Sequence, residues 1–298
     1  MRVISRRTDT GIEVFDADLE PARSFPLPSG VQDSAVISTG DGLVCATDSA
    51  VIRVGAEGQE LWRFPLPTAT GSGSPDSACA WSGDDALIWV YLAGPEAGRG
   101  DRDRWIALDA TTGEPRLEHQ LEIAGQGGQQ FASPDGRYML LEVDEGQNGS
   151  TIFRAGPGTD LHVYPWEDRC LVAVSPDGKQ LMTVEHGQED VAFHAFPGGE
   201  VQAQVSLSAF GSRLGPDVRI EETFLEWTGG YLDDETAIVV ISGEHSRDGD
   251  WWRHFRVDAR TGAVLGELGV VTIDAYDLKP LGDGTYVITD TDGTLRRM

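Results

Sequence analysis

Hydrophobic positions along the chain gather in short runs rather than in long periodic segments. β-Branched and aromatic residues fill stretches such as 34–38, 237–241 and 285–289, and Gly, Asp or Pro bounds each of them. No window carries an apolar stripe with a helical period. Short apolar runs between turn residues are typical of β-strands. The pattern therefore predicts an all-β fold.

The turns between these runs recur at a regular spacing. One class joins two apolar runs through an aspartate, as in the segment 133–136, which reads Ser-Pro-Asp-Gly. Proline presets φ for the first turn position, aspartate bonds its own backbone, and glycine accepts a positive φ. The marker aspartates follow one another at intervals of 42 to 56 residues: Asp41, Asp84, Asp135, Asp177, Asp233 and Asp283.

A second class of turn alternates with the first, at residues 55–58, 109–113, 156–158, 197–199 and 258–262. Each repeat then holds four strands, A to D, with tight A–B and C–D turns. Four strands in about 40–50 residues are the blade of a β-propeller, in which neighbouring blades bury one another's faces. We predict one β-propeller domain over residues 1–298, with six blades counted and an N-terminal strand completing the C-terminal blade. Seven blades are possible if residues 1–30 form most of another blade.

Two segments carry a resemblance to a known family. Residues 131–136 (Phe-Ala-Ser-Pro-Asp-Gly) and 174–179 (Val-Ser-Pro-Asp-Gly-Lys) resemble repeats of bacterial WD40-like and TolB-like β-propellers. Residues 58–64 and 108–113 are similar to quinoprotein-type repeats. The Gly-His and Trp-Asp signatures of WD40 repeats are missing. The resemblance implies the propeller fold, and because its motifs are structural it implies no activity.

The charge excludes one class of partner. The chain has 23 Lys and Arg against 49 Asp and Glu, a formal net charge of −26. Such a field repels polyanions, so we expect no nucleic acid partner.

The longest apolar stretch, 86–94, is far shorter than the roughly 20 residues of a membrane helix, and residues 1–7 lack the apolar segment of a secretory signal. Three widely spaced cysteines indicate reduced thiols and a cytoplasmic location. The excess of arginine over lysine suggests a bacterial source.

Loop lengths indicate where binding would occur. The A–B and C–D turns are short, whereas the B–C and D–A connections, on the opposite face, are long and variable. Long loops on a rigid scaffold commonly carry binding residues. Two B–C loops concentrate arginine and tryptophan, which recognise carboxylates and supply apolar anchors. The predicted binding residues are Arg99, Arg102, Arg104, Arg247, Trp251 and Trp252, with the four arginines on one face. The alternative is two solvated hairpins with internal Asp–Arg pairs and tryptophans that are ordinary strand residues.

The sequence holds no motif that identifies a reaction. It lacks a nucleophile elbow, a phosphate-binding loop and a zinc spacing, so we expect no cofactor and no metal. We favour a non-catalytic platform that binds a protein or peptide through the B–C and D–A face. Whether the protein is an enzyme is left open: a hydrolase or lyase could work at the mouth of a central channel, and a small anionic metabolite is a further alternative ligand. Candidates for the channel mouth are Glu222, Thr223, Glu226, Gln129, Gln130 and Asp274.

Overall fold

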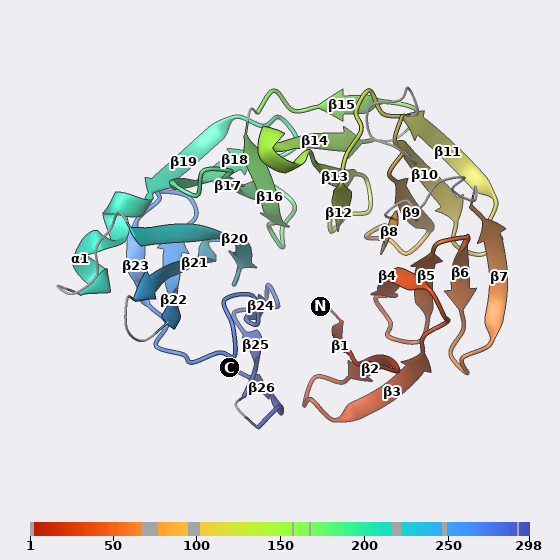
Figure 1. The fold of residues 1–298 in the computed structure, drawn as a ribbon, viewed down its shortest axis with the longest axis horizontal. Helices are drawn as coiled ribbons and strands as arrows, with labels where there is room; N and C mark the ends of the chain where they lie inside the picture. The colour runs from red at the N-terminus through yellow and green to blue at the C-terminus, as the bar shows by residue number, and fades with distance from the viewer. Residues whose placement is uncertain are drawn as a thin grey trace. The chain divides into compact units, whose positions relative to one another are not determined.

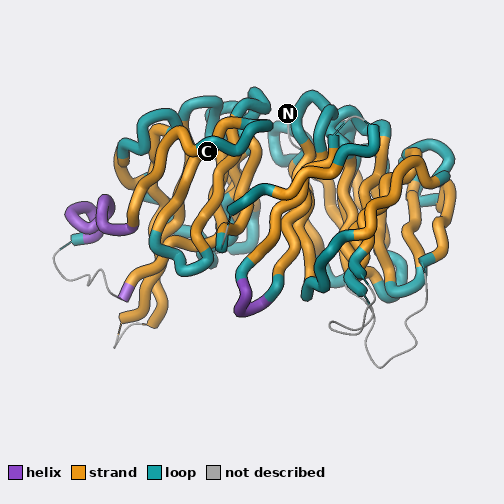
Figure 2. The backbone as a smooth tube through the Cα atoms, turned by 90° about the horizontal axis from the view of Figure 1, so that it is seen from above, coloured by secondary structure: helices purple, strands orange, loops and turns teal. Residues whose placement is uncertain are grey.

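The structure is a computed structural model, and it describes residues 3–66, 77–94, 102–156, 158–166, 168–215, 222–245, 249–290 and 292–298. The chain divides into an N-terminal unit, residues 2–166, and a C-terminal unit, residues 167–298 together with residue 1. Antiparallel strands joined by loops dominate each unit, and the helical segments are short (Figures 1 and 2). Among the described residues, no helix is long and apolar enough to cross a membrane.

The N-terminal unit contains four sheets whose strands follow one another in chain order. The first has three strands and the other three have four. They are β1 (Ile4–Arg7), β2 (Gly11–Phe15) and β3 (Pro21–Pro26); β4 (Val31–Val36), β5 (Leu43–Thr47), β6 (Ala50–Val54) and β7 (Glu60–Pro65); β8 (Ser77–Trp81), β9 (Leu87–Leu92), β10 (Arg104–Asp109) and β11 (Pro115–Gln120); β12 (Gly127–Ala132), β13 (Met139–Asp144), β14 (Ser150–Ala155) and β15 (Leu161–Val163).

The C-terminal unit contains three sheets of the same kind. They are β16 (Arg169–Val174), β17 (Gln180–Glu185), β18 (Asp190–Ala195) and β19 (Val201–Ser206); β20 (Thr223–Tyr231), β21 (Thr236–His245), β22 (Gly249–Asp258) and β23 (Val264–Glu267); β24 (Lys279–Pro280), β25 (Tyr286–Thr289) and β26 (Leu295–Arg297). A short 3-10 helix, Leu207–Phe210, and α1, Gly211–Leu214, follow β19.

The count of six blades is wrong, because the described strands form seven sheets. The N-terminal segment folds on itself: β1 pairs with β2, and β2 pairs with β3. The turn between β2 and β3 contains no glycine. It is fixed by Asp16, whose Oδ1 accepts the N–H groups of Asp18 and Glu20, both at 2.9 Å, while Leu19 takes a φ of 63°. Since β24–β26 form a sheet of their own, the expected completion of the last sheet by an N-terminal strand is not confirmed.

The recurring turns have the local chemistry that the sequence predicts. In the turn after β12, the Ser133 hydroxyl donates to Oδ1 of Asp135 at 2.7 Å, and the N–H of Gly136 donates to the Ser133 carbonyl at 2.9 Å. Gly136 has a φ of 70°, which favours glycine. Ser175, Asp177 and Gly178 repeat this arrangement after β16. The aspartate turns therefore join the first and second strands of a sheet, as expected.

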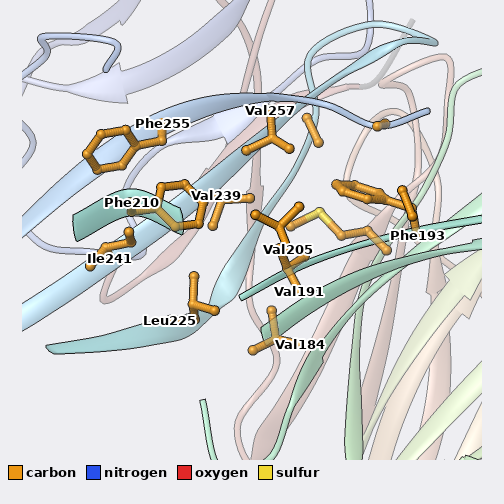
Figure 3. Close-up of a cluster of buried hydrophobic side chains, with 14 of the residues drawn as sticks. Val184, Val191, Phe193, Val205, Phe210, Leu225, Val239, Ile241, Phe255 and Val257 are labelled. Carbon is orange, nitrogen blue, oxygen red and sulfur yellow. The ribbon is translucent and has the colours of Figure 1, made fainter. Parts of the chain in front are cut away.

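Apolar side chains from neighbouring sheets pack together and form the cores within each unit. The largest described cluster lies between the sheets β16–β19 and β20–β23 and includes Val184, Phe193, Phe210, Val239 and Phe255 (Figure 3). Phe210 and Phe255 meet edge to face with ring centroids 5.3 Å apart. A sheet that lies between two other sheets has both of its faces covered. Its middle strands are therefore nearly continuous apolar runs rather than alternating ones.

Polar side chains also join neighbouring sheets within each unit. Oδ2 of Asp33, on β4, accepts the N–H of Cys79, on β8, at 2.7 Å. The Gln130 amide, on β12, accepts the Trp105 indole N–H at 2.8 Å and donates to the Ala78 carbonyl at 3.0 Å. In the C-terminal unit, the Tyr231 hydroxyl donates to Oε1 of Gln180 at 3.0 Å. These bonds satisfy buried polar groups where the sheets meet.

Candidate interaction surface

The B–C and D–A connections of a four-stranded antiparallel meander lie at the same end of the sheet, because successive strands run in opposite directions. We call this the long-connection end. In the C-terminal unit it includes the turn 186–189 after β17, the start of β20 and the connection 268–278 after β23. The first strands β16 and β20 are neighbours, and β20 and β24 are neighbours (Figure 1). Residues on these segments can therefore meet.

A bulge near the start of β20 sets the direction of its side chains. Leu225 is paired with Ile241 and Gly229 with Val239, so Glu226, Trp227 and Thr228 lie opposite one residue of β21. The glycine that ends the bulge is required: its φ is 127°, and a Cβ there would lie 2.2 Å from the Ile238 carbonyl oxygen. Bulges of this kind redirect side chains away from the regular alternation of a strand.

Glu226, in the bulge, is held by two hydroxyl groups. Its Oε1 accepts a short hydrogen bond from Ser242 on β21, and its Oε2 accepts the Tyr276 hydroxyl at 2.8 Å. Burial and this bond to the carboxylate raise the pKa of Tyr276 well above its ordinary value, so the phenol stays protonated and donates. The Glu226 carboxylate therefore joins β20, β21 and the connection 268–278.

Trp227, the next residue of the bulge, lies against the neighbouring sheet. Its ring stacks on His186 with centroids 5.5 Å apart and an interplanar angle of 19°. Its Nε1 donates to the Glu185 carbonyl at 3.4 Å. Despite these contacts, Trp227 is 40% exposed to solvent. An aromatic ring that is held on one side and open on the other is a rigid contact element.

Large exposed apolar residues concentrate at this end of the C-terminal unit. Ten such residues occur among the described positions, and five lie on β20 or on the connection 268–278. We call these five the β20 surface: Phe224, Trp227, Val271, Ile273 and Tyr276. The other five are single residues on the last strands of sheets or at the C-terminus: Leu61, Val163, Val201, Leu265 and Met298. Scattered exposed apolar residues are ordinary, whereas a grouped set indicates a contact surface.

The two predicted tryptophans lie on β22, next to this surface. The Trp252 indole N–H donates to Oγ1 of Thr272 at 2.7 Å, and the Thr272 hydroxyl donates to the Asp274 carbonyl at 2.8 Å. These two hydrogen bonds hold the connection 268–278 in place at Thr272, the residue between Val271 and Ile273. Trp251 packs against the core of the unit, and Arg253 lies over its ring at 5.5 Å. Both tryptophans are half-buried strand residues.

The predicted arginines are in part outside the described residues, namely Arg99 and Arg247. In the N-terminal unit, Arg102 forms a short ion pair with Glu122, and Arg104 pairs with Glu118 at 3.3 Å. Their acceptors are glutamates on β11 and in the connection that follows it. The arrangement on one face and the role in binding stay predictions.

The channel-mouth candidates differ in burial and in bonding, although two of them, Glu226 and Asp274, bond to the same residue. Glu226 belongs to the network with Tyr276, and Oδ1 of Asp274 accepts the Tyr276 N–H at 2.7 Å. Gln130 joins two sheets, while Gln129 and Glu222 are exposed and Thr223 is buried. Sequence reasoning missed all five residues of the β20 surface, Trp227 included. Their grouping depends on contacts between segments far apart in the chain, so no local pattern indicates it.

Comparison with solved structures decides the fold. The β-propeller domain of Myceliophteria thermophila Cps50 (Swd1) matches with a TM-score of 0.54 and 11% identity, covering 91% of this chain and 88% of that one. The fold is a β-propeller. It has seven sheets, and the same fold is found in two further proteins. The WD40 domain of SCAP from fission yeast has a TM-score of 0.51 and 8% identity, with 95% of this chain and 70% of that one covered. A KlHsv2 variant with loop 6CD replaced by a Gly-Ser linker has a TM-score of 0.50 and 9% identity, with 87% and 82% covered. No protein-family model and no curated protein sequence matches the chain.

Proposed function

We propose that this β-propeller is a platform for protein–protein interaction and that its partner binds at the β20 surface. The grouping of five exposed large apolar residues at the long-connection end carries the proposal. Bonds within the chain hold two of the aromatic rings in place, so a partner would meet pre-ordered contacts rather than mobile side chains. The likeness to WD40 propellers supports a role in binding proteins.

The finer predictions from the sequence remain part of the proposal. A cytoplasmic location is supported by Cys45, Cys79 and Cys170, which are buried thiols that form no disulfide. A bacterial, TolB-like origin rests on the two Ser-Pro-Asp-Gly turns. The arginine and tryptophan residues predicted from the loops are proposed as additional contacts. The enzyme and the anionic-metabolite alternatives stay open predictions, and no described residue favours them over the platform.

Site-specific photocrosslinking tests the platform. A photoreactive amino acid replaces Phe224 in one variant and Val201, an exposed residue of β19, in the control. Each variant is produced in the native host, irradiated, and its adducts are identified by mass spectrometry. We expect one reproducible protein adduct at position 224 that is absent at 201 and is lost when Trp227→Ala is added. Equal adducts at both positions, or none at 224, would overturn the proposal.

A further inference from the structure

The segments that build the β20 surface carry charge of one sign. Residues 185–189, 222–228 and 271–278 contain six carboxylates and no Lys or Arg: Glu185, Glu189, Glu222, Glu226, Asp274 and Asp277. Arg169 lies on β16 opposite Glu185 of β17. Its side chain is largely buried and forms an ion pair with Asp190 at 2.6 Å. Lys279 follows the last of these segments as an exposed residue of β24. The surface therefore has a local excess of negative charge within a chain whose net charge is −26.

The exposed rings of this surface differ from other aromatic rings of the protein. Arginine side chains lie over Phe15, Trp81, Tyr138, Tyr164 and Trp251, at 4.7 to 5.8 Å from the ring centroids. In the part of the chain that the structure describes, no arginine or lysine lies over Trp227 or Tyr276. The faces of Trp and Tyr rings attract cations, and Trp does so most strongly. As far as the described residues go, these two rings are open to a cation from a partner, Trp227 on the side away from His186.

Glu226 is bonded to the Tyr276 hydroxyl and directly precedes Trp227 in the bulge, and its carboxylate has the capacity to accept further bonds. The two bonds that hold it come from neutral hydroxyl groups, one on each oxygen. A carboxylate offers about four acceptor positions, so about two remain. Among the described cations, none forms an ion pair with Glu226. Because the residue is half-buried, a cation bound there is screened less than one at an exposed carboxylate.

We infer that the β20 surface binds a basic segment of a partner protein. An Arg or Lys side chain of that segment lies against Trp227 and Tyr276 with its charge on the Glu226 carboxylate. Apolar residues that flank the cation pack on Phe224, Val271 and Ile273. This inference rests on the proposed function and adds the chemistry of the partner. The same charge excess disfavours acidic peptides and anionic membrane surfaces.

Fluorescence anisotropy with two labelled peptides tests the inference on the full chain. One peptide alternates Arg and Leu over eight positions, and the other has citrulline, which is neutral and of similar shape, in place of each Arg. We expect the Arg peptide to bind at least about tenfold more tightly, with the difference shrinking at high salt. Equal affinity for the two peptides would overturn the inference.

Matched variants separate this surface from the general attraction of an acidic protein. Glu226→Gln and Glu114→Gln remove the same charge, and Glu114 lies in the exposed turn after β10. We expect Glu226→Gln to weaken the Arg peptide about tenfold and Glu114→Gln to have little effect. Trp227→Leu gives a second measure, because it keeps every charge and removes the ring; circular dichroism confirms that each variant is folded. Equal effects of the two glutamine variants, or no effect of Trp227→Leu, would contradict the inference.

The crosslinking experiment and the peptide-binding experiment test the two proposals independently. A specific crosslink at position 224, together with equal binding of the Arg and citrulline peptides, would retain the platform and reject the basic partner. Absence of the crosslink would reject the platform whatever the peptides show.

Discussion

The Tyr91 hydroxyl donates a hydrogen bond of 2.6 Å to Oδ2 of Asp103, and neither residue has any exposed surface. The same carboxylate accepts the N–H of Gly94 at 2.7 Å and the N–H of Gly125 at 2.8 Å. Asp103 therefore fixes both ends of the long loop between β9 and β10 and the connection that leads to β12. This residue belongs to the arginine-rich loop of the sequence, yet its role is to anchor the loop.

Replacing Asp103 should lower the stability of the protein strongly. Asp103→Ala removes the carboxylate that accepts from the Tyr91 hydroxyl and from two backbone N–H groups, and we expect this loss to cost about 3 kcal/mol in the free energy of unfolding. Urea unfolding followed by tryptophan fluorescence measures it. Glu122→Gln, an exposed carboxylate of the adjoining connection, serves as control and should change the value by less than about 0.5 kcal/mol. Similar losses for both variants would show that the three buried donors find other partners.

Tyr276 and Glu226 should be energetically coupled. In a double-mutant cycle of Tyr276→Phe and Glu226→Gln, the hydrogen bond between the side chains predicts a coupling of about 1 kcal/mol in the free energy of unfolding. Tyr276→Phe combined with Glu114→Gln, whose side chain lies in the other unit, should be additive. If both cycles are additive, the bond makes no contribution in solution.

His254 should make the protein less stable in mild acid. It is 1% exposed, neither ring nitrogen has a described hydrogen-bond partner, and burial lowers its pKa to about 4, against a smaller opposing effect of Asp277. The unfolded chain thus binds a proton near pH 6.5 that the folded chain does not bind until about pH 4. The free energy of unfolding therefore falls as the pH drops through this window, by about 2 kcal/mol between pH 7.5 and pH 5 for this one residue.

The variant His254→Leu should lose this part of the pH dependence. Chemical unfolding at pH 7.5 and pH 5 measures the difference for each protein. His194, whose pKa is also lowered to about 4 by burial, should still make the variant somewhat sensitive to acid. A variant that loses as much stability as the wild type would contradict the effect assigned to His254.

Adjacent glutamines on β12 offer a matched pair. Gln130→Ala removes the acceptor of the Trp105 indole and the donor to the Ala78 carbonyl, and we expect it to lower the free energy of unfolding by about 2 kcal/mol. Gln129→Ala, at the exposed neighbouring position, should have an effect below about 0.5 kcal/mol. Thermal and urea unfolding of both variants give the comparison, and equal melting temperatures would refute the role of Gln130.

Local turn chemistry was readable from the sequence, and the sheet count was not. Ser133, Asp135 and Gly136 specify their turn by bonds within a few residues, so their pattern predicts the structure directly. The N-terminal sheet was left as an alternative and not counted as a blade, because its second turn relies on Asp16 and on Leu19 with a positive φ, without the glycine that usually marks such a position. The short polar strand β1 also lacks an apolar run.

The β20 surface depends on relations that a single sequence does not reveal. Residues 81–83 (Trp-Ser-Gly) and 227–229 (Trp-Thr-Gly) look alike, but Trp81 is buried at the end of β8 whereas Trp227 lies exposed in a bulge. The bond between Tyr276 and Glu226 joins residues fifty positions apart. Neither the bulge nor this contact follows from local propensity, so the sequence alone does not point to this surface.

The polar bonds between sheets differ at the three junctions described above. One uses the Asp33 carboxylate and a backbone N–H, another the Gln130 amide and an indole, and a third the Gln180 amide and a phenol. Transplanting one module into the place of another would leave donors facing donors and acceptors facing acceptors. The repeats share a common fold, but they are not interchangeable, because the polar groups that meet at these three junctions differ from one junction to the next.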